Sequence, residues 1–194
     1  DTRSIILPYC LGGISGEDIF NVNYDPCTNS LLDMNEAYAD WYFYFRRDRY
    51  DYVVRDTFNT VEQRPVKIMT MDAMLKEKDA LPVDVLILDA QGAEYDILQG
   101  AKNTLASDVL AVITEVEFRP LYKGQKLFGD ICSTLSEKGF EFVKFAKALR
   151  EYSPYRKAVG LRCQGFDTVG DAIFFKRLDE IENADTEKKA VMLD

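Results

Sequence analysis

The sequence predicts an α/β domain whose sheet is parallel through the middle of the chain. Strand and helix patterns alternate there, and two of the strand patterns are nearly continuous apolar runs. Such runs are typical of parallel strands that helices cover on both faces. The 194 residues, 47% of them hydrophobic, suffice for one domain with a sizeable core. In such sheets, ligands bind at the carboxyl ends of the strands.

The N-terminal segment is predicted to form a strand, a turn and a second strand. Residues 4–11 are apolar, and residues 18–24 alternate between apolar and polar side chains. Gly12, Gly13 and Gly16 lie between them and raise the possibility of a phosphate-binding loop. A dinucleotide motif must open a helix, whereas strand periodicity follows these glycines, so the pattern favours a turn.

Residues 38–52 are unusually rich in aromatic side chains, which are interleaved with arginines. We interpret residues 38–58 as an insertion whose rings pack over one side of the core. Two alternatives stay open: an aromatic wall for a substrate or partner, and a platform for single-stranded nucleic acid. The net charge of −9 disfavours nucleic acid because phosphate backbones would be repelled.

The central elements are predicted from residue 66 onward. Residues 66–71 alternate as a strand, and Asp72 is placed to cap a short helix over residues 73–78. Pro82 introduces the apolar run 83–88, which we predict to be a central strand covered on both faces.

A single helix is predicted from Glu94 to about residue 107, followed by a buried strand over residues 109–116. The next predicted helix ends at Gly139, a residue typical of a helix C-terminus. Strands over residues 140–145 and 172–176 are separated by a loop-rich segment. The predicted apolar helix faces comprise Ile97, Leu98, Ala101 and Leu105, then Leu127, Phe128, Ile131, Cys132 and Leu135. Residues 1–178 form the predicted domain and residues 179–194 a charged tail.

Composition excludes several classes of chemistry. The chain contains no histidine, which rules out Ser-His-Asp or Cys-His catalysis and histidine-containing zinc sites within it. The four cysteines are widely spaced and predict a reduced protein rather than a disulfide framework. No apolar run is long enough to span a membrane, so we expect a cytoplasmic protein without a membrane partner.

Polar side chains gather where the two apolar strands end. Asp89, Gln91 and Glu94 follow the first strand, and Glu115 and Glu117 lie near the end of the second. The carboxyl ends of parallel strands share one edge of a sheet, so these groups should lie close together. A carboxylate that ends a core strand is costly to bury unless it is paired or binds a ligand, which makes Asp89 the leading candidate site residue.

Several segments resemble the FkbM-type methyltransferases. The central motif is a hydrophobic strand followed by DAQGAE and a helix, and the resemblance extends over most of residues 4–176. The segments that carry it are VDVLILDAQGAEYDILQGAKNTL (residues 83–105), ITEVEFRPLYKGQKLFGDICSTLSEKGF (113–140), LPYCLGG (7–13), NSLL (29–32) and VKIMTMDAML (66–75).

The resemblance implies a class I, Rossmann-like fold that binds S-adenosylmethionine and has an antiparallel C-terminal strand. It implies methyl transfer, usually to the hydroxyl oxygen of a small molecule or sugar. The cofactor-binding residues it indicates are Leu11, Gly12, Asp89 and Gln91, with the first two near the adenine. Asp89 would orient the cofactor or acceptor, and Glu115 would serve as a base. By analogy Asp89 could instead bind Mg²⁺, but no second cluster of oxygen ligands is evident in the sequence.

On the acceptor side, Trp41, Tyr122 and Ser30 are the candidate substrate contacts. The resemblance also implies a glycine-rich cofactor loop and first strands ahead of the segment seen here, so we expect a chain truncated upstream of them. Exposed sheet edges would then favour formation of a homo-oligomer. The alternative is a non-catalytic methyltransferase-like module that binds a glycan or protein through its aromatic segment.

Overall fold

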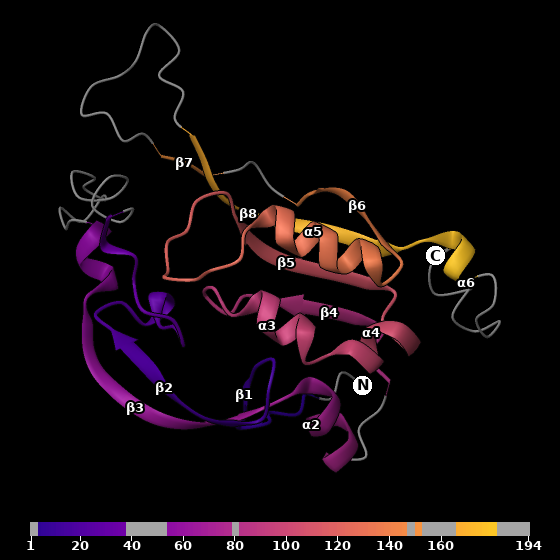
Figure 1. Cartoon of the computed structure of the whole chain (residues 1–194), viewed down its shortest axis with the longest axis horizontal. Coiled ribbons are helices and arrows are strands. Elements are labelled where there is room, and N and C mark those ends of the chain that lie inside the picture. Colours follow the sequence, from indigo (N-terminus) through magenta and orange to yellow (C-terminus); the bar gives the residue numbers. More distant parts are fainter. Residues whose placement is uncertain (1–3, 38–53, 79–81, 147–149, 153–165, 182–194) are drawn as a thin grey trace, which may run out of the picture.

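The computed structural model describes residues 4–37, 54–78, 82–146, 150–152 and 166–181, which form two sheets with helices (Figure 1). The first sheet has the order β1-β3-β2. β1 (Cys10–Leu11) is parallel to β3 (Thr60–Met69), and β2 (Gly16–Asn23) is antiparallel to β3. A turn joins β1 to β2, as the glycines predicted, and no helix begins there.

Strand lengths in this sheet differ from those predicted. The predicted strand 4–11 shrinks to two residues because β1 pairs only with Ile68 and Met69 at the end of β3. β3 instead begins six residues before its predicted start, because β2 pairs along its whole length, from Gly16 opposite Ile68 to Asn23 opposite Thr60. The two strands form the long curved arm of Figure 1.

The second sheet has the order β4-β5-β8-β6, with β7 also paired to β8. Its strands are β4 (Val85–Leu88), β5 (Ala111–Glu117), β6 (Phe140–Phe145), β7 (Arg150–Tyr152) and β8 (Phe166–Lys176). β4 and β5 are parallel, while β8 is antiparallel to β5, β6 and β7. The expected antiparallel C-terminal strand is therefore present.

The expectation of a mostly parallel sheet is wrong for the described residues, since two of their six strand pairings are parallel. β8 inserts between β5 and β6, and the pairing of β2 with β3 adds a further antiparallel pair. The loop-rich interpretation of residues 146–171 also needs correction, because β7 and the first half of β8 lie within that range.

β4 is an edge strand rather than a central one. Within the described chain its only strand partner is β5, and its side chains alternate between the core and solvent. Leu86 and Leu88 are buried, whereas Val85 and Ile87 are 50% and 69% exposed. One face of this sheet is therefore covered in the described part of the chain, and the prediction of burial on both faces is wrong.

Three helices cover the buried face, namely α3 (Glu94–Gln99), α4 (Lys102–Ser107) and α5 (Phe128–Glu137) (Figure 1). The predicted single helix over residues 94–107 is interrupted at Gly100. A β-carbon on Gly100 would overlap the carbonyl oxygen of Gly12. The β1–β2 turn therefore lies against the chain at the point where α3 and α4 are interrupted. The predicted apolar face is confirmed, since Ile97, Leu98 and Leu105 lie in the core.

Asp72 caps a different helix from the one predicted. α2 (Met71–Lys78) already contains Asp72 in its first turn, and the carboxylate reaches instead to the start of α4. It accepts the N–H groups of Asn103 and Thr104 at 2.9 and 3.0 Å and the Thr104 hydroxyl at 2.7 Å. Burial opposes ionisation, but these hydrogen bonds outweigh it and lower the pKa of the Asp72 carboxyl. Asp72 therefore joins α2 to α4.

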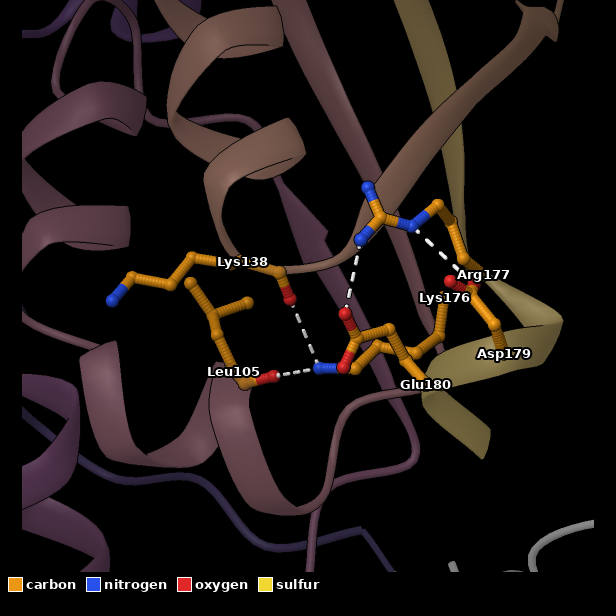
Figure 2. A network of polar contacts seen from close by, with 6 residues as sticks. All are labelled: Leu105, Lys138, Lys176, Arg177, Asp179 and Glu180. Carbon is orange, nitrogen blue, oxygen red and sulfur yellow. Dashed lines mark hydrogen bonds and ion pairs between the residues drawn. The ribbon is translucent and has the colours of Figure 1, made fainter. Parts of the chain in front are cut away.

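The C-terminal end of the domain is held by a buried lysine. Lys176, at the end of β8, donates from Nζ to the carbonyl oxygens of Leu105 at 2.7 Å and Lys138 at 3.1 Å (Figure 2). These carbonyls lie in the last turn of α4 and at the C-cap of α5. Gly139 follows with φ +82°, which confirms the predicted helix terminus. The adjoining Arg177 pairs with Glu180 of α6 (Leu178–Ile181).

Trp41 and the rest of the aromatic segment 38–52 lie outside the described residues. The end of the predicted insertion is described as a short 3₁₀ helix, Val54–Phe58. There Phe58 is buried and meets the ring of Tyr122 edge-on, with centroids 6.1 Å apart. Every helix that the structure describes is too short or too polar to cross a membrane.

Candidate functional site

The turn between β4 and α3 is closed by Glu94. Its carboxylate accepts the backbone N–H of Ala90 at 2.7 Å and that of Gly92 at 2.9 Å. Gly92 has φ +100°, and a β-carbon there would lie 3.0 Å from the ring of Tyr122. Glycine is required both for this backbone conformation and for the close packing. Glu94, the first residue of α3, thus has a structural role, because its carboxylate holds the preceding turn closed.

Gln91 connects the ends of the two parallel strands. Its side-chain nitrogen Nε2 donates to Asp89 Oδ1 at 2.8 Å and to Glu115 Oε2 at 2.9 Å. Asp89 follows the last residue of β4, and Glu115 lies in β5 one residue beyond the pairing of Leu88 with Thr114. The prediction that these polar groups share one edge of the sheet is confirmed.

Ser30 and Tyr122 both contact Gln91. The Ser30 hydroxyl donates to the Gln91 backbone oxygen at 2.6 Å. The single Tyr122 hydroxyl proton has two acceptors within reach, the Thr28 carbonyl at 3.1 Å and Gln91 Oε1 at 3.4 Å. Both side chains are fully buried, so in this structure their hydroxyls hold the site together. Their predicted contact with substrate stays a prediction.

Three carboxylates converge at this edge. One oxygen each from Asp89, Glu94 and Glu115 lies within 4.8 Å of the others. Two unit charges at that separation repel by roughly 3.5 kcal/mol at an effective dielectric constant of about 20. The β4–α3 turn brings Glu94 to Asp89 and Glu115, so three of the polar residues expected at this edge form one cluster of oxygen ligands. Binding of Mg²⁺ by Asp89 stays a prediction. The cluster favours a positively charged or hydrogen-bond-donating neighbour.

Glu117 lies behind this cluster and is only 2% exposed. Burial, together with the charges of Glu94 and Glu115, raises the pKa of the Glu117 carboxyl well above its usual range, and the Gln125 amide partly opposes this. The pKa of the Tyr122 hydroxyl is raised as well, first by burial and then by the charge of Glu117. The Tyr122 hydroxyl is thus kept protonated as a donor.

Glu117→Gln should make the protein more stable at pH 8 and flatten its pH dependence. The folded state binds the Glu117 proton more tightly than the unfolded state, where the pKa is near 4.5. The stability of the wild type should therefore fall as pH rises from 4.5 through the raised pKa, by about 1.4 kcal/mol for each tenfold difference in proton affinity between the two states. Urea unfolding between pH 5 and 8 would measure this. A variant with the wild-type pH slope would contradict the buried-acid assignment.

A cavity of about 420 Å³ opens beside the carboxylates. The first sheet, the loop after β2 and the β4–α3 turn all contribute to its wall. Its lining includes the predicted cofactor residues Leu11, Asp89 and Gln91; Gly12 does not line it and packs against Gly100 instead. Lining residues that the sequence did not indicate are Cys10, Phe20, Pro26, Cys27, Asn29 and Leu31. Cys10, Asn29 and Leu31 lie in the segments LPYCLGG and NSLL that carry the family resemblance. No local pattern, however, shows that the six residues fold against the β4–α3 turn.

A family model described as the Methyltransferase FkbM domain matches residues 25–142, more than half of the chain. The chain belongs to the FkbM methyltransferase family. The matched range is narrower than the expected 4–176, but it contains Ser30, Asp89, Gln91, Glu115 and Tyr122. Neither a curated protein nor a solved structure matches the chain. The polar residues at the carboxyl ends of β4 and β5 in this FkbM domain thus belong to the matched family segment.

Proposed function

We propose that this FkbM domain is the catalytic part of an S-adenosylmethionine-dependent methyltransferase with a class I, Rossmann-like sheet. We propose that it methylates a hydroxyl oxygen on a small molecule or sugar and acts in the cytoplasm. Membership of the family supports methyl transfer. The observation that carries the proposal is the cavity at the ends of the parallel strands, with Asp89 and Gln91 in its wall and Glu115 bonded to Gln91.

The residues of the cavity fit the cationic part of this cofactor. Its volume of about 420 Å³ lies within the range of small-molecule pockets, roughly 300–1,000 Å³. Leu11, Phe20 and Ile97 offer apolar surface for a base, and Asp89 offers a negative charge for a sulfonium. Among the residues that the structure describes, no lysine or arginine lines this cavity to meet the cofactor's own carboxylate. We therefore infer that another segment supplies that part of the site.

The open side of the second sheet supports this inference. β4 has an unpaired edge in the described chain, and Val85, Ile87 and Phe175 are exposed on the same face. Unpaired strand edges and exposed apolar faces are normally covered in native proteins. We propose that a further segment of the complete protein pairs with β4 and completes the cofactor site, so that residues 1–194 alone bind S-adenosylmethionine weakly.

The chain's own residues would act on the acceptor. Bound S-adenosylmethionine supplies a methyl group on an activated, cationic leaving group. Glu115 would accept the hydroxyl proton as the acceptor oxygen gains the methyl group, and Asp89 would orient the reacting groups. Gln91 holds both carboxylates in place. Such a reaction needs alignment and a carboxylate base, so the absence of histidine is no obstacle.

Asp89→Asn is the test of this assignment. In the protein expressed from its complete gene, transfer of labelled methyl from S-adenosylmethionine to hydroxylated small molecules and sugars should fall by about 100-fold or more. Asp84→Asn, at the other end of β4 and also exposed, is the matched control and should retain activity. Wild-type turnover in Asp89→Asn would remove Asp89 from the active site.

Calorimetric titration of S-adenosylmethionine tests the role of the further segment. Micromolar, single-site binding by residues 1–194 alone would contradict the need for that segment. No binding and no transfer by the complete protein would instead support the alternative function, a glycan- or protein-binding module. If the aromatic segment forms the binding site of such a module, Trp41→Ala would weaken binding of the glycan or protein.

A further inference from the structure

We propose that the side-chain amide of Gln91 takes the place of a cation between Asp89 and Glu115. In this proposal Gln91 is a positioning residue that acts through the two carboxylates. It sets their separation, and it keeps divalent cations out of a cluster that would otherwise bind them. The inference concerns the carboxylates themselves, so it goes beyond methyl transfer and is tested without it.

The first support is the set of contacts around the amide. Nε2 has two hydrogens, and they point to Asp89 Oδ1 at 2.8 Å and Glu115 Oε2 at 2.9 Å. At the other end of the amide, Oε1 lies 3.4 Å from the buried Tyr122 hydroxyl, whose one proton is shared with the Thr28 carbonyl at 3.1 Å. The two carboxylates determine the orientation of the amide, because they accept hydrogen bonds and an amide oxygen has none to donate. A partially positive nitrogen therefore faces both carboxylates.

The second support is the backbone of Gln91. Its φ is +49°, and among the described residues it is the only non-glycine residue with positive φ. Glycine adopts this conformation at the lowest cost, while other residues do so under strain that their surroundings must maintain. Here the Ser30 hydroxyl holds the Gln91 backbone oxygen at 2.6 Å. In this strained conformation the Gln91 side chain reaches the carboxylate cluster. Glycine would adopt the same backbone conformation more easily but has no side chain to place there.

The third support is the chemistry of the cluster. Oxygens of Asp89, Glu94 and Glu115 lie within 4.8 Å of one another, and carboxylate oxygens are the preferred ligands of hard cations. Glu94 already accepts two backbone N–H groups, which fixes its orientation. Asp89 is exposed and lines the cavity, so an ion has a route to the cluster. What stands between these carboxylates is the Gln91 nitrogen.

The test is a gain of cation binding when the amide is removed. Tb³⁺ is the probe, because it prefers carboxylate oxygens and tyrosine sensitises its luminescence at close range. Gln91→Gly removes the amide and suits the positive φ, and Gln91→Glu replaces the amide with a fourth carboxylate beside Asp89, Glu94 and Glu115. Both variants should bind one Tb³⁺ about 10–100-fold more tightly than the wild type. Excess Mg²⁺ should compete.

Two controls locate the site. Gln99→Glu adds the same charge on α3, where Gln99 donates to Thr134 instead, and it should not gain binding. Adding Asp89→Asn to Gln91→Gly should abolish the gain. Thermal melts by circular dichroism check folding, and if Gln91→Glu is unfolded, Gln91→Gly decides the question.

The inference is overturned if the wild type binds Tb³⁺ as tightly as Gln91→Gly, because the amide would then not occupy the cation position. It is also overturned if a folded Gln91→Gly gains no binding. Neither measurement involves S-adenosylmethionine, so failure here leaves the methyltransferase proposal standing, and failure of that proposal leaves this inference standing.

Discussion

Gly100→Ala is expected to destabilise the protein by about 3 kcal/mol. The added methyl group would overlap the Gly12 carbonyl oxygen and lie 3.2 Å from Thr70 Cβ. The overlapping atom is backbone, which cannot rotate away as a flexible side chain would. The Gly100 carbonyl also accepts the Asp72 N–H at 3.1 Å. Three chain segments therefore meet at Gly100, and relief of the clash must separate at least two of them.

Urea unfolding at constant pH measures this effect, and Gly129→Ala is the matched control. Gly129 lies in α5, where nothing stands within 4 Å of the position of its β-carbon. Alanine favours helix more than glycine does, so the control should gain up to about 1 kcal/mol. If Gly100→Ala unfolds at the same urea concentration as the wild type, the result contradicts the close contact between the β1–β2 turn and the α3–α4 junction.

Lys176→Met is expected to lower the free energy of unfolding by about 2–3 kcal/mol. Methionine replaces the stem of the side chain but cannot donate hydrogen bonds. The carbonyls of Leu105 and Lys138 would lose their shared Nζ donor at the ends of two helices (Figure 2). A buried acceptor without a donor costs roughly 1–3 kcal/mol, and relief from burying a charge offsets part of that. Loss of the Nζ contact with the Phe140 ring, at 4.6 Å from its centroid, adds to the cost.

Lys144→Met tests whether the effect belongs to this position. Lys144 is exposed on β6, so the same substitution there should change stability by no more than about 0.5 kcal/mol. Equal losses from both substitutions would mean that the Lys176 hydrogen bonds contribute nothing specific. Denaturant midpoints for the two variants, measured side by side, decide between these results.

Local patterns predicted most of the central elements. The helix at Phe128–Glu137, its termination at Gly139 and the strand Phe140–Phe145 follow from periodicity and from one glycine. These features depend on neighbours within a few residues, where side-chain spacing and backbone preference act directly. The shared edge of Asp89 and Glu115 was predictable for a similar reason, because parallel strands end on the same side.

Features that depend on distant contacts were not predictable from such patterns. An apolar run has the same sequence pattern in an edge strand and in a central strand. The exposure of Val85 and Ile87 therefore follows only from the order of strands in the sheet. The break at Gly100 depends on the backbone of Gly12, and Asp72 caps α4 because folding brings Asn103 and Thr104 to it. In both of these contacts the deciding neighbour is distant along the chain.

The sequence by itself therefore determined the chemistry available to this FkbM domain: carboxylates, an amide and a tyrosine, with no imidazole. It also determined the two strands that carry the acidic residues. Only the tertiary structure decided how these groups interact, with Gln91 between Asp89 and Glu115, and with β1, Phe20 of β2 and the loop after β2 forming the other wall of the cavity. The physical reason is that residue types determine charge and donor capacity locally, whereas repulsion, burial and pKa depend on distances that the packing of remote segments sets.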